Sequence, residues 1–326
     1  LYTAFYLNSG VNSIQSSGGS IIISATDAGS NTDNYAVNQG SSSSISANQN
    51  IIFQGASLAA PTPGSLTSAA GAVSPVFASA NTDSAMTGPS SARTLSWTGA
   101  MTATDGYISL RGNSVISGLM TASNASGGLV INGAGTYNLS NTSNNISTIG
   151  ASIGTSNLTF VNGSALKIGT VNSITGITAG AITLTAAGLT GSENITPSAS
   201  SSITINNSSG SYDYTGVISG SSTVTKQGSG SQILSGANTY SGFTTISAGT
   251  IKLNNATALG TTAAGTSISS SGVLDLNGFN YSNAEALTIN GTGIASGGAL
   301  INSSTTAATY SGLLTLGSDS SVVGGS

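Results

Sequence analysis

Residues 228 to 253 read Gly228-Ser-Gly-Ser-Gln-Ile-Leu-Ser-Gly-Ala-Asn-Thr-Tyr240-Ser-Gly-Phe-Thr-Thr-Ile-Ser-Ala-Gly-Thr-Ile251-Lys-Leu253. Short runs of apolar β-forming residues alternate with Gly or Asn-Thr, which interrupt each run before the next begins. Part of the unit recurs as a Tyr-x-Gly triplet that precedes a β-rich run. The triplet occurs at Tyr214-Thr-Gly216, Tyr240-Ser-Gly242 and Tyr310-Ser-Gly312. A unit this small cannot bury its own apolar face and must stack on its neighbours. The stretch therefore predicts one coil of an all-β parallel solenoid.

Apolar residues that alternate along the chain predict which side chains point inward. Ile251 and Leu253 are two residues apart, as are Leu274 and Leu276, so each pair lies on one face of a strand. Lys252 falls between the first pair and Asp275 between the second, so we expect both charges outside the coil, with Lys252 beside Asp275 on the next one. The same alternation predicts further strands at Ile21/Ile23, Ile108/Leu110, Leu129/Ile131, Leu158/Phe160, Leu166/Ile168, Ile182/Leu184, Ile203/Ile205, Leu287/Ile289 and Leu314/Leu316.

Residues 219 to 260 also resemble a known family. Thr225-Lys-Gln-Gly-Ser-Gly230, Leu234-Ser-Gly-Ala-Asn-Thr-Tyr-Ser-Gly242 and Ala248-Gly-Thr-Ile-Lys-Leu253 are similar to the passenger-associated repeat of bacterial autotransporters. The resemblance is specific over residues 219–303. It continues more loosely to 129–326, where residues 158–188 are similar to repeats of haemagglutinin-like surface proteins. It implies a right-handed parallel β-helix that is secreted to the bacterial cell surface.

Three segments follow from these patterns. Residues 1–55 are β-rich and read as the start of the solenoid, and residues 99–326 read as a β-helix with passenger-type repeats. Residues 56–98 are rich in Pro, Ala and Ser and hold Pro61, Pro63, Pro75 and Pro89. Because proline cannot donate to a central ladder, we expect this stretch to be a long loop or an excursion from the helix.

The composition excludes several classes of function. The 326 residues contain only five Lys and Arg, nine Asp and Glu, and no His or Cys, while 38% are hydrophobic. The hydrophobic content argues against disorder. The chain has no basic run that could neutralise phosphates, so we expect no nucleic-acid partner. No apolar run approaches the ~20 residues that span a bilayer, so we expect no membrane-spanning segment.

No cluster of residues indicates catalysis or a cofactor. The acidic residues are spread thinly, with Asp27 and Asp33 the nearest to a pair, so we expect neither an enzyme nor a bound cofactor or metal. Asp275-Leu-Asn277-Gly278 resembles the start of a calcium loop but lacks its later acidic ligand, which favours a turn. Tyr214, Tyr240 and Tyr310 are candidates for a carbohydrate-stacking stripe, although packing in the core is the favoured interpretation.

The N-terminal strand is the candidate for self-association. Leu1, Tyr2, Phe5, Tyr6 and Leu7 form an aromatic β-segment that either caps the core or pairs with another chain. We expect a non-catalytic extracellular structural or adhesive protein that associates with copies of itself, with surface glycans and other cells as further partners. A subunit of a homopolymeric filament or surface layer is the first alternative, and a β-helical carbohydrate-active enzyme is the second.

Overall fold

The structure, a computed structural model, describes residues 100–324 except 104, 105 and 126, and the backbone of nine strands between Tyr6 and Trp97. The chain is a parallel β-solenoid that folds as two units. Unit 1 holds Leu1–Ser164 with Thr170–Thr175, and unit 2 holds Ala165–Gly169 with Gly176–Ser326. The fold class predicted from the sequence is confirmed, whereas the proposed segment boundaries stay a prediction.

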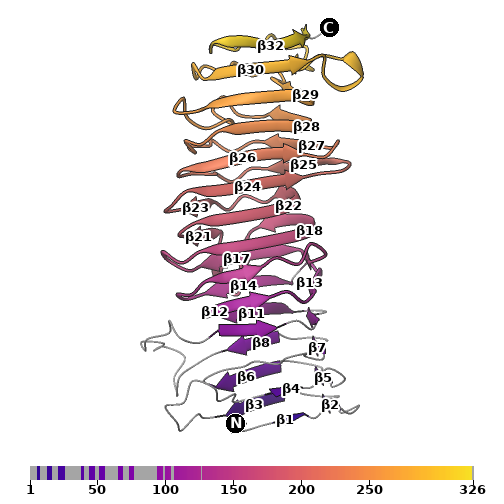
Figure 1. Cartoon of the computed structure of the whole chain (residues 1–326), viewed down its shortest axis with the longest axis vertical. Coiled ribbons are helices and arrows are strands. Elements are labelled where there is room, and N and C mark those ends of the chain that lie inside the picture. Colours follow the sequence, from indigo (N-terminus) through magenta and orange to yellow (C-terminus); the bar gives the residue numbers. More distant parts are fainter. Residues whose placement is uncertain are drawn as a thin grey trace. The chain divides into compact units, whose positions relative to one another are not determined.

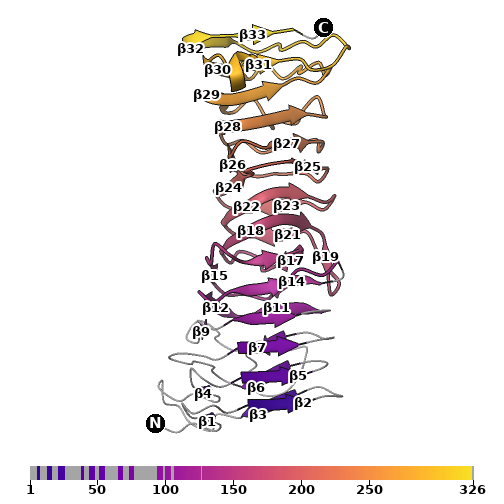
Figure 2. The ribbon, with the colours of Figure 1, turned by 90° about the vertical axis from the view of Figure 1, so that its right-hand side faces the viewer.

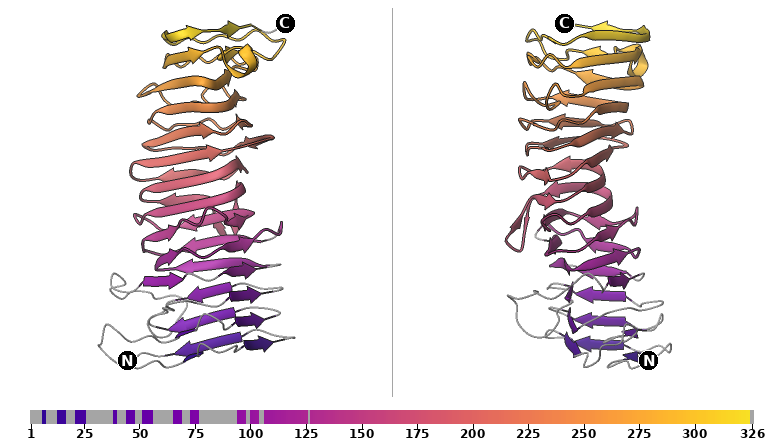
Figure 3. Two further views of the ribbon diagram at one scale, coloured as in Figure 1. Left: turned by 45° about the vertical axis from the view of Figure 1, so that its right-hand side comes forward. Right: turned by 60° about the vertical axis from the view of Figure 1, so that its left-hand side comes forward.

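Unit 1 stacks parallel strands on successive coils (Figures 1 and 3). One wall contains β2 (Ser13–Ser16), β5 (Ser44–Ala47), β7 (Ser65–Ser68), β10 (Met101–Ala103), β13 (Met120–Ala122) and β16 (Asn145–Ile146). A second contains β3 (Ile21–Ala25), β6 (Ile51–Gly55), β8 (Val73–Val76), β11 (Tyr107–Arg111), β14 (Gly128–Asn132) and β17 (Thr148–Ser152).

The remaining strands of unit 1 complete the coils. A third wall contains β9 (Thr94–Trp97), β12 (Asn113–Ile116), β15 (Tyr137–Leu139) and the beginning of β18 (Leu158–Ile168). β1 (Tyr6–Leu7) pairs with β4 (Asn38–Gln39) in parallel. β19 (Thr170–Val171) and β20 (Ile174–Thr175) form an antiparallel hairpin, which Asn172 and Ser173 turn with positive φ angles of 44° and 66°.

Unit 2 repeats this arrangement with longer strands. Its broad wall contains β22 (Ile182–Thr190), β24 (Ser201–Asn206), β26 (Ser222–Gln227), β28 (Thr244–Leu253), β29 (Gly265–Asp275), β30 (Ala286–Gly291) and β32 (Leu314–Ser320), stacked in that order in Figure 1. Figure 2 shows the adjoining wall, which contains β25 (Ser211–Tyr214), β27 (Ser231–Leu234), the later halves of β28 and β29, β31 (Leu300–Ile301) and β33 (Val322–Val323). β21 (Ile177–Ala179) pairs with β23 (Ile195–Pro197), and Ile294–Ser296 form a short 3-10 helix, η2.

The core consists of inward columns in which each side chain stacks on its equivalent one coil away. Ile251 lies in register with Leu274, and Lys252 with Asp275, as the alternation predicts. The two inward pairs, Ile251/Leu253 and Leu274/Leu276, are buried, so this register is confirmed. Burying each such aliphatic side chain contributes about 1.5–3 kcal/mol.

Leu314 and Leu316 differ from the predicted inward pairs between Ile108 and Ile289, which are buried. They continue the columns of Leu287 and Ile289 on β32, yet they are 39% and 60% exposed. The reason is that β32 pairs with β30 along one edge and no described strand lies along the other.

Residues 56–98, for which we expect a long loop or an excursion from the helix, contain three described strands. β7, β8 and β9 lie inside this stretch and each pairs with strands of neighbouring coils. Pro75 lies within β8, opposite Phe53 of β6. On its other side β8 is matched to β11 at Val73 and Val76, so the positions that flank the proline hold the strand in the ladder. The other residues of this stretch lie outside the described residues.

Candidate functional site

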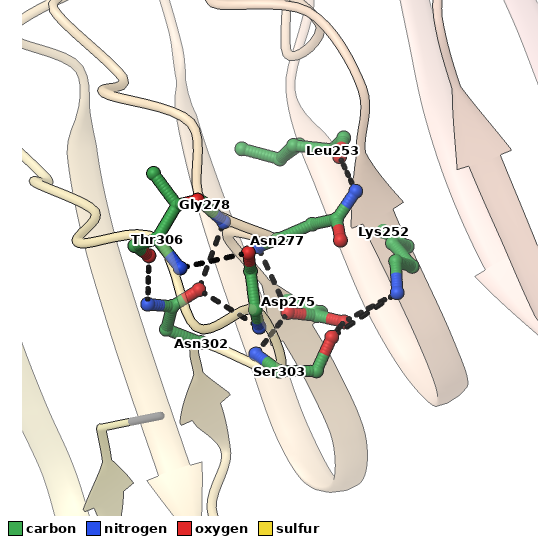
Figure 4. A network of polar contacts seen from close by, with 9 residues as sticks. Lys252, Leu253, Asp275, Asn277, Gly278, Asn302, Ser303 and Thr306 are labelled. Atoms are coloured by element: carbon green, nitrogen blue, oxygen red, sulfur yellow. Dashed lines mark hydrogen bonds and ion pairs between the residues drawn. The ribbon is translucent and has the colours of Figure 1, made fainter. Parts of the chain in front are cut away.

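Asp275 is the centre of a polar network at the end of β29 (Figure 4). Its Oδ1 accepts the backbone N–H groups of Asn277 and Ser303, both at 2.9 Å. Its Oδ2 accepts the Ser303 hydroxyl at 2.6 Å and lies 3.5 Å from the Lys252 Nζ, which also donates to Ser303 Oγ at 3.1 Å. One carboxylate therefore joins three successive coils.

The turn after β29 explains why this network forms. Asn277 and Gly278 have φ angles of 49° and 81°, a left-handed turn that reverses the chain directly after Asp275. The Asn277 amide donates back to the Leu253 carbonyl at 2.9 Å, and Gly278 N–H donates forward to Asn302 Oδ1 at 2.8 Å. Asx side chains that bond local backbone are typical of such turns.

The predicted position of Asp275 needs one correction. The Lys252 side chain is 31% exposed, as expected for an outward charge, but the Asp275 side chain is only 4% exposed. It points away from the aliphatic column, yet Ser303 of the following coil covers it. Because its oxygens already accept three hydrogen bonds and face an ammonium, Asp275 acts here as a turn anchor.

Lys226 is a buried cation that the alternation did not identify. It occupies the inward position of β26, between Ile205 of the preceding coil and Ile246 of the next. The side chain is fully buried, and Nζ donates to the carbonyls of Gln227 and Gly228, both at 2.7 Å, and of Ala248 at 3.3 Å. Burial lowers the pKa of Lys226 to about 8. These three carbonyls match the three N–H donors of the ammonium.

Its placement could have been read from the sequence. Lys226 stands two residues after Val224 and therefore shares its inward face. The charge argued against that assignment, because an unpaired ammonium is costly to bury. In the structure, carbonyl oxygens from two successive coils accept hydrogen bonds from the buried ammonium and so compensate its burial.

Glu285 is a buried acid with hydroxyl partners. Oε1 accepts the Thr266 hydroxyl and Oε2 the Tyr281 hydroxyl, both at 2.7 Å, while the residue is 2% exposed. Burial raises the pKa of the Glu285 carboxyl above its ordinary value, and the two hydrogen bonds oppose that shift. The Tyr310 hydroxyl donates to the Glu285 backbone carbonyl at 3.0 Å. No Lys or Arg contacts the carboxyl among the residues that the structure describes.

The tyrosines proposed for a carbohydrate-stacking stripe pack in the core instead. Tyr214 and Tyr240 are fully buried, and the Tyr240 hydroxyl bonds Thr244 Oγ1 at 2.7 Å. Tyr310 is half-buried and stacks on Tyr281, with ring centroids 5.3 Å apart and planes at 12°. The favoured interpretation, core packing, is confirmed, and burial raises the pKa of all three phenols.

Asparagine side chains link the coils through hydrogen bonds to backbone groups. Asn144 and Asn162 are buried. Asn144 Oδ1 accepts Met120 N–H at 2.8 Å, and its amide donates to the Val161 carbonyl at 2.9 Å. Each amide therefore bonds backbone groups of adjacent coils, which satisfies donors and acceptors at the corners.

Of the N-terminal residues proposed for self-association, the structure describes two. Tyr6 and Leu7 form β1 and pair with Asn38 and Gln39 of the same chain, so one edge of this strand is occupied in cis. Leu1, Tyr2 and Phe5 lie outside the described residues, as do Asp27 and Asp33. Within the described part of the chain, no group of His, Cys, Asp and Glu is arranged to hold a metal ion. The same part contains no helix with the length and apolarity required to cross a bilayer.

Comparisons with known proteins agree with this geometry. Residues 224–253, which contain most of β26 and all of β27 and β28, match the family model described as Passenger-associated-transport-repeat. A stretch of 131 residues, 40% of this chain, is 36% identical to the adhesin BmaC autotransporter of Brucella suis biovar 1 (strain 1330), of which it covers 4%. No solved structure matches the chain. The predicted resemblance to autotransporter passengers is thus confirmed, and the chain spans a small part of the length of this relative.

Proposed function

We propose that this chain is a segment of an extracellular, adhesive autotransporter passenger that is displayed on the bacterial cell surface and has no catalytic role. The observation that carries the proposal is the coincidence of the passenger repeat, residues 224–253, with the strands β26 to β28. The similarity to an autotransporter adhesin supports the same assignment.

The polar residues of unit 2 support a structural use of its charges. Asp275 is saturated by donors, Lys226 is enclosed by carbonyls, and Glu285 is buried among hydroxyls. A glycoside-cleaving site needs two carboxylates that share a cleft open to substrate, and neither Asp275 nor Glu285 offers one. These observations favour adhesion over the alternative of a carbohydrate-active enzyme.

Adhesion can be tested by display. Residues 1–326 would be presented on a non-adherent bacterial strain, with surface exposure measured by antibody binding. We expect the displaying cells to bind abiotic surfaces or other cells more than cells that display an unrelated solenoid at equal density. Equal binding by the two strains would contradict the proposal.

We further propose that copies of this chain associate with one another, in a filament or a layer. The 326 residues include only five Lys and Arg and nine Asp and Glu, so few like charges keep copies of the chain apart. Sedimentation of the purified chain over a range of concentrations tests this. A constant monomeric mass would contradict it.

A further inference from the structure

An unbroken outward column of hydroxyl side chains runs along the broad wall of unit 2. Each member lies in register with the next, from β22 to β32: Thr185, Thr204, Thr225, Thr245, Ser267, Thr288 and Thr315. Neighbouring strands in a sheet are about 4.7–4.9 Å apart, so the hydroxyls repeat at that spacing. Thr183, Ser202 and Thr223 form a second, shorter column beside it.

The hydroxyls of the long column have no hydrogen-bond partner in the part of the chain that the structure describes. The inward hydroxyls of the same strands behave differently, since Thr244 bonds Tyr240 and Thr266 bonds Glu285. The column therefore offers a row of donors and acceptors to an external partner.

This part of the wall has no charge. The charged residues of its strands lie elsewhere: Lys226 points inward, and Lys252, Asp275 and Asp319 lie in the later halves of their strands. A surface without charge does not attract an anionic partner, and it does not offset the free energy that a charged partner loses on desolvation. Complementarity therefore favours a neutral partner.

An aromatic ring adjoins the hydroxyls. Phe243 is 44% exposed, the most exposed aromatic side chain that the structure describes, and it stands two residues before Thr245. Its ring lies against Gly265 on the next coil, where a Cβ would come within 3.4 Å of Cε2. The Phe243 ring therefore lies at ordinary van der Waals distance from this position of the next coil.

We propose that this wall binds a neutral polysaccharide, which stacks a sugar ring on Phe243 and exchanges hydrogen bonds with the hydroxyl column. Sugar rings combine an apolar face with a periphery of hydroxyl groups, and these match an aromatic face and a row of Thr and Ser. This inference rests on the proposed adhesive function, because it names the class of partner that such a segment would hold.

A protein partner fits this surface less well. The residues that dominate protein interfaces are Trp, Tyr and Arg, whereas Ser and Thr are under-represented among them. The experiment below distinguishes a polysaccharide on this wall from a second copy of the chain.

The test measures retention of the full chain, residues 1–326, on insoluble polysaccharides. Cellulose and chitin serve as neutral probes and alginate as the anionic one. Phe243→Ala removes the stacking ring, and the combination Thr204→Val, Thr225→Val and Thr245→Val removes hydroxyls while keeping β-branched side chains. Thr250→Val is the matched control, since it makes the same change in the later half of β28, on the adjoining wall.

We expect the chain to bind a neutral polysaccharide and each wall variant to weaken the apparent affinity by about tenfold or more, with Thr250→Val within about twofold of the unmodified chain. Circular dichroism of each variant establishes that it is folded. Failure to bind either neutral probe, binding to alginate alone, or equal binding by all variants would overturn the inference. Loss of oligomers in the wall variants without loss of polysaccharide retention would instead assign the wall to a second copy.

The display assay separates this inference from the function on which it rests. Displaying cells that adhere while the purified chain ignores both neutral polysaccharides would leave adhesion intact and refute the glycan wall. Cells that do not adhere would refute the adhesive function itself.

Discussion

Replacement of Asp275 provides a direct test of the network in Figure 4. Asp275→Ala removes the acceptor of the Asn277 and Ser303 N–H groups and the partner of the Ser303 hydroxyl. Each part-buried donor left without an acceptor costs about 1–3 kcal/mol, so we expect the local stability to fall by about 3 kcal/mol. Asp275→Asn retains Oδ1 for both N–H groups but loses the negative charge beside Lys252, which predicts a smaller loss of about 1 kcal/mol.

The measurement has to be local, because stacked coils need not unfold as one cooperative unit. Hydrogen exchange of a peptide that covers residues 272–279 reports the opening of β29 and its turn. Asp319→Ala is the control, since Asp319 is exposed. The reasoning fails if the peptide is less protected from exchange in Asp275→Asn than in Asp275→Ala. It also fails if its protection in both variants equals that in Asp319→Ala.

Four further changes give measurable outcomes. Leu276→Asp places an unpaired charge in the core, and we expect a loss of several kcal/mol in urea unfolding, against a small effect for Lys252→Gln. The pKa of Glu285 is raised in the folded state, so its protonation stabilises the fold fully at acidic pH. This stabilisation is lost as the pH rises through the folded-state pKa of Glu285. We expect Glu285→Gln to remove this pH dependence of the melting temperature. The pKa of Lys226 is lowered to about 8 from 10.5, so stability should rise between those two pH values and should not do so in Lys226→Met. Deletion of residues 1–7 should reduce oligomers in sedimentation if this strand pairs with another copy, and unchanged oligomers would show that it does not.

The sequence predicts the repeating part of the structure well, because alternation is a local property. Ile251, Leu253, Leu274 and Leu276 could be placed inside, and Lys252 beside Asp275, from a spacing of two residues within a strand and one coil between strands. The burial of Asp275 could not be predicted, since Ser303 covers it from 28 residues further along the chain.

The polar interior was less accessible to sequence reasoning. A lysine at an inward position contradicts the usual cost of burying charge, and only the carbonyls around Lys226 reconcile the two. Glu285 gave no signal either, because its partners Thr266 and Tyr281 are neutral residues whose inward positions are known only once the coils are stacked.

The irregular register between β28 and β29 bears on how such a chain can change over generations. Ile246 is matched to Ile268, 22 residues on, whereas Ala248 is matched to Ser271, 23 residues on, so β29 contains one additional residue at this corner. Inside a strand the same insertion would turn every later side chain to the opposite face. At the corner a bulge absorbs it, and Thr250, Ile251 and Lys252 still meet Val273, Leu274 and Asp275. Genes that encode such coils can therefore gain or lose single codons at corners, and duplicate whole coils, while the inherited columns stay aligned.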